Sequence, residues 1–293
     1  MKVGLQINRF DYPGGNNKIG QNVHDVSIAA EQAGFDSIWV MDHFFQLEHI
    51  GQYTDPMLES YTTLGYIAGI TSKVKLGTMV TGVIYREPAL LINAVTTLDV
   101  VSGGRAYLGI GAGWNEQEAK AFGLLNPLQS RRFERLEDTL KLALQMWSGD
   151  SQAFNGNIYN LPEPYLSPQP ITKPHPPILI GGGGEEKTLR LVAKYGDACN
   201  LFAHDIDILS HKLEVLKKHC QEINRPYEEI EKTSLIGVNI ATALKDFQQT
   251  IDQAKTLKSL GIEHIIFANS HDIEASAYSQ FSKIVRIIHD LND

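Results

Sequence analysis

The sequence predicts a (β/α)8 barrel, and two observations carry this prediction. Short runs rich in Val, Ile and Leu alternate with stretches of helical periodicity along nearly the whole chain of 293 residues. These runs are apolar throughout, which is typical of parallel strands that are covered on both faces. Eight such strand–helix units fit a single barrel domain spanning residues 1–293. An open doubly wound sheet is the alternative that the pattern leaves.

The expected strands are short, and the intervals between them have room for crossover helices. They cover residues 3–7, 37–41, 74–80, 106–110, 178–180, 198–202, 233–238 and 264–268. Two helices show a clear apolar stripe at spacings of three and four. The stripes consist of Phe133, Leu136, Leu140, Ala143, Leu144 and Trp147, and of Phe281, Ile284, Val285, Ile288 and Leu291. We expect both stripes to be packing surfaces.

One interval, between the fourth and fifth strands, is much longer than the others. It holds the first of these helices and a proline-rich segment at residues 161–177. Repeated prolines exclude a helix there, because each removes a backbone donor and clashes with the preceding turn. Since the strand–helix rhythm resumes directly afterwards, we expect an ordered insertion over the barrel surface.

The charge, the apolar runs and the cysteines of the chain limit the partners and the location that we expect. The chain has 26 Lys and Arg against 34 Asp and Glu, a net charge of -8, and no basic run, so neither nucleic acid nor an anionic membrane surface is expected to bind. No stretch of 18 apolar residues occurs, and the apolar run at the N-terminus is too short for a signal peptide. Cys199 and Cys220 lie outside any CxxC spacing, which indicates free thiols in a reducing compartment and a cytoplasmic location.

Barrel active sites form at the carboxyl ends of the strands. The residues at or just after the expected strand ends therefore define the candidate site. They are Asp42, His43 and Phe45, then Met79, Val80 and Gly82, then Ala112, Gly113 and Trp114, then Gly181, Gly182, Gly183 and Gly184, and finally Phe202.

His43 follows a strand and stands beside a carboxylate. An imidazole that titrates near neutral pH is a natural proton donor or acceptor, and Asp42 would orient it or bind a ligand. A purely structural histidine is the alternative. His49 invites a metal site with His43, but the sequence contains no HxH or HxxxH pair, and we predict no metal.

Two glycine-rich segments indicate a bound ligand. The four glycines that end at Gly184 precede a stretch, 185–189, that we interpret as the first turn of a helix, with Lys187 and Thr188 as further donors. Free backbone N–H groups at such a turn favour a phosphate, and a tight turn with close packing is the alternative. The glycines at 109, 111 and 113 follow the fourth strand, where a dinucleotide fingerprint is not expected, and would let a flat ligand approach the backbone beside Trp114.

Five motifs together resemble the bacterial luciferase-like superfamily and, within it, the oxidoreductases that depend on coenzyme F420, a deazaflavin. They are GFDSIWVMDH at 34–43, LGTMVTGV at 76–83, LDVVSGGR at 98–105, LGIGAGW at 108–114, and ILIGGGG at 178–184 followed by KTL at 187–189. The resemblance covers essentially the full length in order. It implies a barrel that binds a flavin or deazaflavin at its carboxyl-terminal mouth.

The resemblance also assigns roles to residues. It implies that Asp42 and His43 lie beside the cofactor, with His43 catalytic, and that Met79–Val80 is a non-prolyl cis peptide supporting the ring. The further cofactor contacts that it implies are Ala112, Gly113, Gly183 and Gly184. From their positions in the sequence we also predict Gly82, Gly182, Lys187 and Thr188 as cofactor contacts and Phe45, Trp114 and Phe202 as the substrate pocket. The family usually forms homodimers, so we expect one here.

Two departures from the family pattern bear on function. The F420-dependent sugar-phosphate dehydrogenases carry a glutamate where this chain has Trp114 and a tryptophan where it has Leu47, so glucose 6-phosphate oxidation is not expected. Luciferase has a phosphate-binding arginine where this chain has Ala112, which disfavours FMN. We therefore expect hydride transfer between coenzyme F420 and a small organic substrate. The alternatives are an FMN-dependent monooxygenase fed by a partner flavin or deazaflavin reductase, a metal-dependent barrel hydrolase and a non-catalytic flavin-binding protein.

Overall fold

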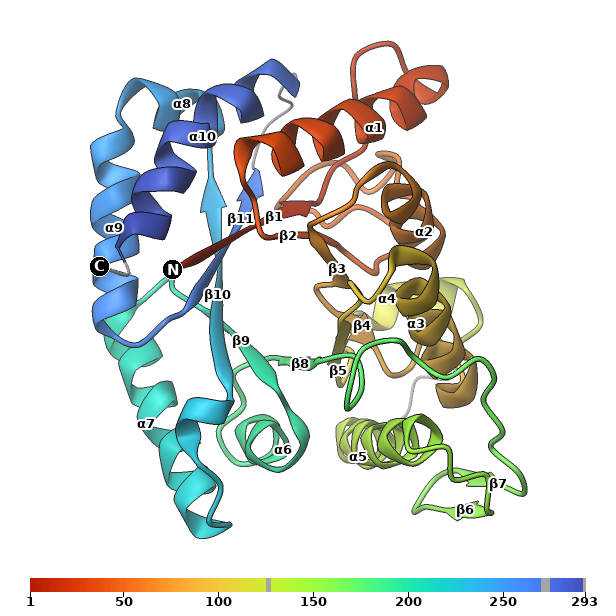
Figure 1. Ribbon diagram of the computed structural model, residues 1–293. Coiled ribbons are helices and arrows are strands. Elements are labelled where there is room, and N and C mark those ends of the chain that lie inside the picture. The colour runs from red at the N-terminus through yellow and green to blue at the C-terminus, as the bar shows by residue number, and fades with distance from the viewer. Residues whose placement is uncertain (125–127, 270–274, 292–293) are drawn as a thin grey trace.

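The computed structural model describes residues 1–124, 128–269 and 275–291, and it confirms the predicted barrel. Parallel strands surround the centre of the molecule and helices cover them from outside (Figure 1). The barrel strands are β1 (Lys2–Ile7), β2 (Ser37–Val40), β3 (Lys75–Thr78), β4 (Thr81–Gly82), β5 (Leu108–Gly111), β8 (Ile178–Gly181), β9 (Ala198–Phe202), β10 (Glu231–Val238) and β11 (His264–Asn269).

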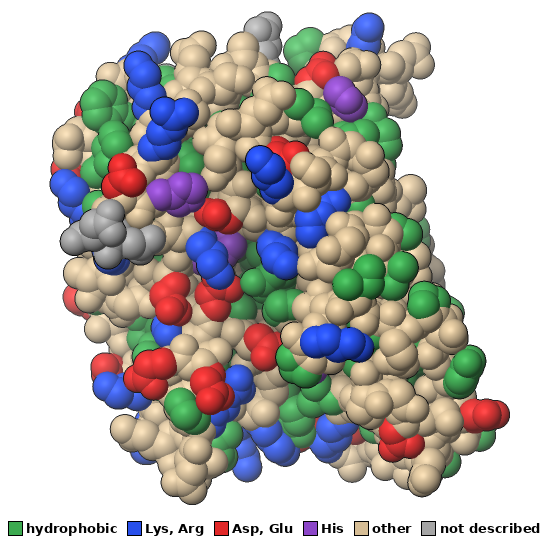
Figure 2. Space-filling model, in the orientation of Figure 1, with side chains coloured by type: hydrophobic (Ala, Val, Ile, Leu, Met, Phe, Trp, Pro, Cys, Tyr) green, Lys and Arg blue, Asp and Glu red, His purple; other side chains and the backbone are tan. Residues whose placement is uncertain are grey.

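The helices follow the strands along the chain, as expected for crossover connections. They are α1 (Asn16–Ala33), α2 (Ser60–Ile70), α3 (Pro88–Ser102), α4 (Glu116–Ala121), α5 (Gln129–Trp147), α6 (Thr188–Tyr195), α7 (Ile206–Glu222), α8 (Ile240–Lys245), α9 (Phe247–Ser259) and α10 (Ala275–Asp290), with a 3-10 turn at Tyr227–Glu229. Among the described residues, none of the helices has both the length and the apolarity that crossing a bilayer requires. Figure 2 shows acidic and basic side chains interspersed over one face of the molecule.

The third predicted strand, 74–80, is observed as β3, and a further short strand, β4, follows it outside the predicted range; the split between the two halves of this segment closes the barrel. The strand order is β3-β2-β1-β11-β10-β9-β8-β5-β4, so the two halves lie at opposite ends of one sheet. β3 pairs with β2, β4 pairs with β5, and an isolated bridge joins Leu76 to Ala106. The peptide bond between Met79 and Val80, at the split, is cis, as predicted.

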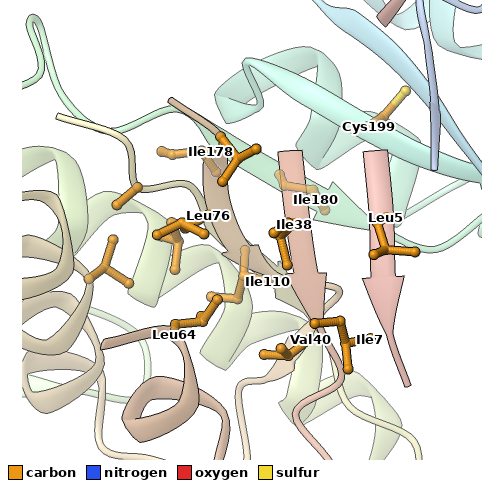
Figure 3. Close-up of a cluster of buried hydrophobic side chains, with 14 of the residues drawn as sticks. Leu5, Ile7, Ile38, Val40, Leu64, Leu76, Ile110, Ile178, Ile180 and Cys199 are labelled. Carbon is orange, nitrogen blue, oxygen red and sulfur yellow. The ribbon is translucent and has the colours of Figure 1, made fainter. Parts of the chain in front are cut away.

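Strand alternation divides the apolar side chains between two cores. Ile38 and Val40 point outward into the large cluster between strands and helices, where Leu64 of α2 also lies (Figure 3). Trp39, between them, points into the barrel, where it packs with Met79 and Tyr107. Both faces of these strands are therefore apolar, which is why the sequence shows continuous runs instead of alternation.

The described residues between β5 and β8 form an ordered insertion. It contains α4, α5, the antiparallel hairpin β6 (Phe154–Asn155) and β7 (Asn160–Leu161), and an extended proline-rich segment (Figure 1). As predicted, residues 161–177 contain no helix. The carboxylate of Asp99 on α3 accepts hydrogen bonds from the backbone N–H (2.9 Å) and hydroxyl (2.7 Å) of Thr172, which fixes the segment against the barrel.

One helix start was predicted too early. Residues 185–187 form a turn, and α6 begins at Thr188 instead of at Glu185. The reason is that the N–H of Leu189 donates to the carbonyl of Gly184 at 3.0 Å, five residues back, so the chain closes a wider turn before the α-helical pattern begins.

A polar network fills the amino-terminal end of the barrel. The carboxylate of Glu231 accepts from Lys2 Nζ (2.9 Å) and the Tyr107 hydroxyl (3.3 Å), and it faces His264 Nδ1 at 3.3 Å. His264 Nε2 in turn lies 2.9 Å from the hydroxyl of Ser37. Burial favours the neutral acid, but His264 and Lys2 outweigh it and hold the pKa of Glu231 at about 2.

We expect Glu231→Gln to lower the free energy of unfolding at pH 7 by on the order of 3 kcal/mol. Because the pKa of Glu231 in the folded chain is about 2, below its ordinary value of 4.5, its contribution is present above pH 4.5 and is lost as the pH falls towards 2. Urea denaturation at pH 7 and at pH 4 measures the difference between variant and parent. Glu229→Gln, at a side chain that is 60% exposed and paired with Arg225, is the control and should change stability by less than about 1 kcal/mol. A Glu231→Gln effect that does not shrink with falling pH contradicts the assignment.

Candidate active site

A cavity of about 910 Å³ opens at the carboxyl-terminal end of the barrel. Its wall draws residues from the ends of the barrel strands and from the start of α5, which is where barrel enzymes place their active sites. Of the fifteen residues predicted to be catalytic, cofactor-binding or substrate-binding, ten line it. They are His43, Met79, Val80, Gly82, Ala112, Gly113, Trp114, Gly182, Thr188 and Phe202.

His43 is fixed in the wall by a carboxylate that the sequence analysis missed. Its Nδ1 lies 2.8 Å from Oε2 of Glu118, on α4, and its ring meets Trp114 edge-on with centroids 5.6 Å apart. An ionised carboxylate only accepts hydrogen bonds, so Nδ1 carries a proton. In the neutral imidazole, Nε2 is then free to accept one, and no described residue contacts it through a hydrogen bond.

Glu118 is fully buried, and each of its two oxygens accepts two hydrogen bonds. Oε2 accepts from His43 and from the Tyr85 hydroxyl (2.7 Å), and Oε1 accepts from the backbone N–H groups of Phe44 (2.8 Å) and Phe45 (3.0 Å). Burial works against the charge, but these donors outweigh it and hold the pKa of Glu118 below its usual value. Burial and the neighbouring Glu118 raise the pKa of Tyr85. Glu118 is therefore ionised at neutral pH and determines how His43 is oriented.

Asp42 lies behind the cavity wall. Its carboxylate is 2% exposed, pairs with Arg86 and accepts from the hydroxyl of Ser60 at 2.8 Å. Burial opposes the charge of Arg86, yet Asp42 and Glu59 raise the pKa of Arg86 above its usual value. Asp42 is thus paired with Arg86, and His43 is hydrogen-bonded to Glu118 instead of to Asp42. The predicted contact between Asp42 and the cofactor stays a prediction.

Four other predicted residues lie outside the cavity lining: Phe45, Gly183, Gly184 and Lys187. Phe45 stacks on Tyr53 with centroids 4.5 Å apart. Lys187 Nζ lies 5.4 Å from the ring centroid of Phe133, which does line the cavity. At Gly183 an added Cβ would meet Nζ of Lys212 at 2.5 Å. Lys187 and Gly183 thus stand next to the predicted phosphate end of the cavity without forming its surface.

The cis peptide is held from inside the barrel. Gln6 of β1 donates from Nε2 to the carbonyl of Met79 at 3.2 Å, and both side chains line the cavity. Val80 lies between two glycines, because a Cβ at Gly111 or at Gly181 would approach its methyl groups to 3.0 Å or 2.9 Å. Glycine at both positions therefore lets the Val80 side chain form part of the cavity wall.

Arg132 is a second residue that the sequence analysis missed. It lies at the start of α5, is 8% exposed and lines the cavity. Nη1 donates to the carbonyl of Gly113 (3.1 Å) and Nη2 to Glu116 (3.2 Å). Its buried Nε has no hydrogen-bond partner among the described residues. A cationic side chain in a cavity wall that keeps an N–H group without a partner is suited to an anionic ligand group.

Sequence signals for both missed residues existed. Glu118 follows the glycine-rich end of β5 within the segment that begins α4, and Arg132 stands in the first turn of the predicted helix that carries the Phe133 stripe. Among the described residues, no three His, Cys, Asp or Glu side chains are grouped to hold a metal ion.

A closed parallel barrel with a buried carboxylate–imidazole pair at its carboxyl-terminal mouth defines a barrel enzyme that handles a proton beside a ligand cavity. The chain belongs to the luciferase-like monooxygenase family, whose family model matches residues 13–245.

Relatives with assigned names support this membership. The chain is 34% identical over 213 residues to an F420-dependent glucose-6-phosphate dehydrogenase of Kineococcus radiotolerans, with 71% of this chain and 61% of that protein covered. It is 33% identical over 181 residues to the F420-dependent hydroxymycolic acid dehydrogenase of Mycobacterium tuberculosis, with 61% and 48% covered. The chain thus spans less than two thirds of the length of these relatives. A solved F420-dependent secondary alcohol dehydrogenase has the same fold, with a TM-score of 0.82, 19% identity and 98% of each chain covered.

We expect Glu118→Gln to change the tautomer of His43. A glutamine would place an N–H donor among groups that all donate, so Nδ1 of His43 would lose its acceptor and the proton would shift toward Nε2. The ¹⁵N chemical shifts of the His43 ring measure this. Because the pKa of Glu118 lies below its usual value of 4.5, the parent protein should keep its Nδ1–H form from pH 8 down to at least pH 5.

Stability checks the same substitution. Loss of a charged acceptor for four donors should lower the free energy of unfolding by about 1–3 kcal/mol. Glu134→Gln, at an exposed side chain paired with Arg131, is the matched control. It should change neither the ¹⁵N shifts of the His43 ring nor the free energy of unfolding. An unchanged His43 spectrum in Glu118→Gln contradicts the orienting role.

Proposed function

We propose that this protein is an oxidoreductase that transfers hydride between coenzyme F420 and a small organic substrate. The observation that carries the proposal is the pairing of His43 with buried Glu118 at a glycine-walled cavity large enough for a flat cofactor and a substrate. The F420-dependent names of the relatives support the choice of cofactor.

The wall of the cavity suits a flat ring system. Gly82 and Gly113 approach so closely that a Cβ at Gly82 would lie 3.1 Å from the Gly113 Cα. Together with Gly111 and Gly181, they present backbone and the Val80 side chain to the cavity in place of larger side chains. A ring that is as planar as a deazaflavin can lie against such a surface.

The cofactor also needs a hydrogen-bond donor for its phosphate, and Arg132 is placed to be that donor. The Arg132 side chain lines the same cavity as Gly182 and Thr188, and its Nε has no hydrogen-bond partner among the described residues. The contact between Lys187 and Phe133 shows that the starts of α5 and α6 are neighbours. We therefore assign the phosphate to Arg132, the Gly182 backbone and the Thr188 hydroxyl.

Coenzyme F420, when bound, supplies a ring that accepts or donates hydride. The chain's part is to manage the proton. Nε2 of His43 would accept the hydroxyl proton when an alcohol is oxidised and return it when a carbonyl is reduced, while Glu118 stabilises the imidazolium. Trp114 and Phe202 at the cavity wall would exclude water from the reacting atoms.

Cofactor titrations test the proposal. We expect the protein to bind F420 more tightly than FMN, and Arg132→Met to weaken F420 binding about 10–100-fold, because a charged hydrogen bond contributes about 1.5–3 kcal/mol. Fluorescence of F420 measures the dissociation constant. Arg131→Met removes the neighbouring arginine, whose side chain is 54% exposed, and should leave the affinity unchanged. Tighter binding of FMN would instead favour the monooxygenase fed by a partner reductase.

His43→Ala tests the proton transfer. Loss of a general acid–base group lowers the rate by about 10²–10⁴-fold. We expect that loss in single-turnover reduction of bound F420 by an alcohol, with the F420 dissociation constant changed less than about threefold. His211→Ala, at a histidine that is 61% exposed on α7, is the control. A parent-like rate for His43→Ala from pH 6 to 8 would make the histidine structural.

We also propose a homodimer and a cytoplasmic location. The outward faces of α2 and α3 carry no charged side chain and expose Tyr66, Leu90 and Val101. An uncharged face on two adjacent helices is typical of an interface between copies of a chain.

The cytoplasmic location is supported by the cysteines. Cys199 and Cys220 are buried free thiols, which fits a reducing compartment.

A further inference from the structure

We propose that the substrate is a neutral alcohol or carbonyl compound with a flat apolar body that lies against Trp114. This inference rests on the proposed function and adds the substrate class. It follows from the distribution of charge and of exposed apolar side chains around His43.

The cavity offers few groups for a charged substrate. Among its described lining residues there is no Lys, Asp or Glu, and Arg132 alone has a permanent charge. Arg132 donates to Gly113 and Glu116 and is assigned to the cofactor phosphate. A sugar phosphate would therefore bring a second dianion into a cavity whose described lining offers no second permanent cation, and an unpaired buried charge is costly.

The side of the cavity beside His43 is mainly apolar. Trp114 meets the His43 ring at 5.6 Å, and the loop that follows His43 adds Leu47 and Ile50 together with the neutral or cationic ring of His49. Trp114 is 62% exposed, and Phe202 on the same cavity is 53% exposed. Large aromatic side chains left open on a concave surface mark a site for an apolar ligand.

The position of Trp114 also fixes what part of the substrate it contacts. A substrate hydroxyl must reach Nε2 of His43 for its proton to be accepted, so the carbon skeleton next to that hydroxyl meets the Trp114 ring. On oxidation, the carbinol C–H bond breaks and its hydride passes to F420, the hydroxyl proton passes to His43, and a C=O bond forms. The atoms and both electrons are thereby accounted for.

Tryptophan fluorescence gives a binding readout that is independent of turnover. The chain has three tryptophans, and Trp39 (0% exposed) and Trp147 (4%) are buried, so iodide quenches Trp114 selectively. We expect 1-phenylethanol to shield Trp114 from iodide, with and without F420, and glucose 6-phosphate to leave the quenching unchanged. Shielding by glucose 6-phosphate alone, or by neither compound, overturns the inference.

Turnover of the F420-loaded enzyme provides the second measurement. We expect kcat/KM for 1-phenylethanol to exceed that for glucose 6-phosphate at least tenfold, and Trp114→Glu to lower it about tenfold or more, as loss of one apolar contact does. Tyr165→Glu alters an aromatic residue that is 70% exposed outside the cavity and should match the parent. Preference for glucose 6-phosphate overturns the substrate class while F420 binding still supports the proposed function. Absence of F420 binding overturns the proposed function, whereas shielding of Trp114 would still support an apolar ligand.

Discussion

The buried carboxylate of Glu118 is the constraint on which the active site depends. A charge this deep in the protein is stable only when hydrogen bonds replace its hydration, and four donors do so here. Two of the donors are backbone N–H groups of the loop after β2, so Glu118 fixes the path of that loop as well as the ring of His43. The insertion after β5 and the loop after β2 are thus joined through one side chain.

The side chains inside the barrel form the floor of the cavity. Trp39 fills the barrel centre and packs with Met79, whose carbonyl is held by Gln6. Val80, the other half of the cis peptide, is accommodated by the absence of side chains at Gly111 and Gly181. The floor of the cavity is therefore continuous with the core, and a change of volume around Trp39 would be transmitted to the cofactor surface.

The sequence predicted the fold well because the fold depends on local patterns. Every expected strand is present, since each is a short apolar run, and the proline-rich segment lacks a helix for the reason given by its composition. The site was harder to predict. His43 and Glu118 are 75 residues apart, and nothing local to either residue indicates that they meet. Asp42, the adjacent carboxylate, was the natural partner for His43, but neighbouring residues in extended chain point in opposite directions, so only one of the two can face the cavity.

The insertion between β5 and β8 contributes three residues around the cavity. In the proposed function, Trp114 would contact the substrate, Glu118 would orient His43 and Arg132 would bind the phosphate, while the barrel strands would supply the surface for the ring. The Nη1 bond of Arg132 to the Gly113 carbonyl connects the phosphate donor to the residue just before Trp114. With this division of roles, changes in the one segment would alter the substrate and leave the ring surface in place, because a loop on a rigid scaffold can vary without loss of the core. The substrate class proposed for this chain, which differs from those in the names of relatives that are about a third identical over the matched residues, would fit that division of roles.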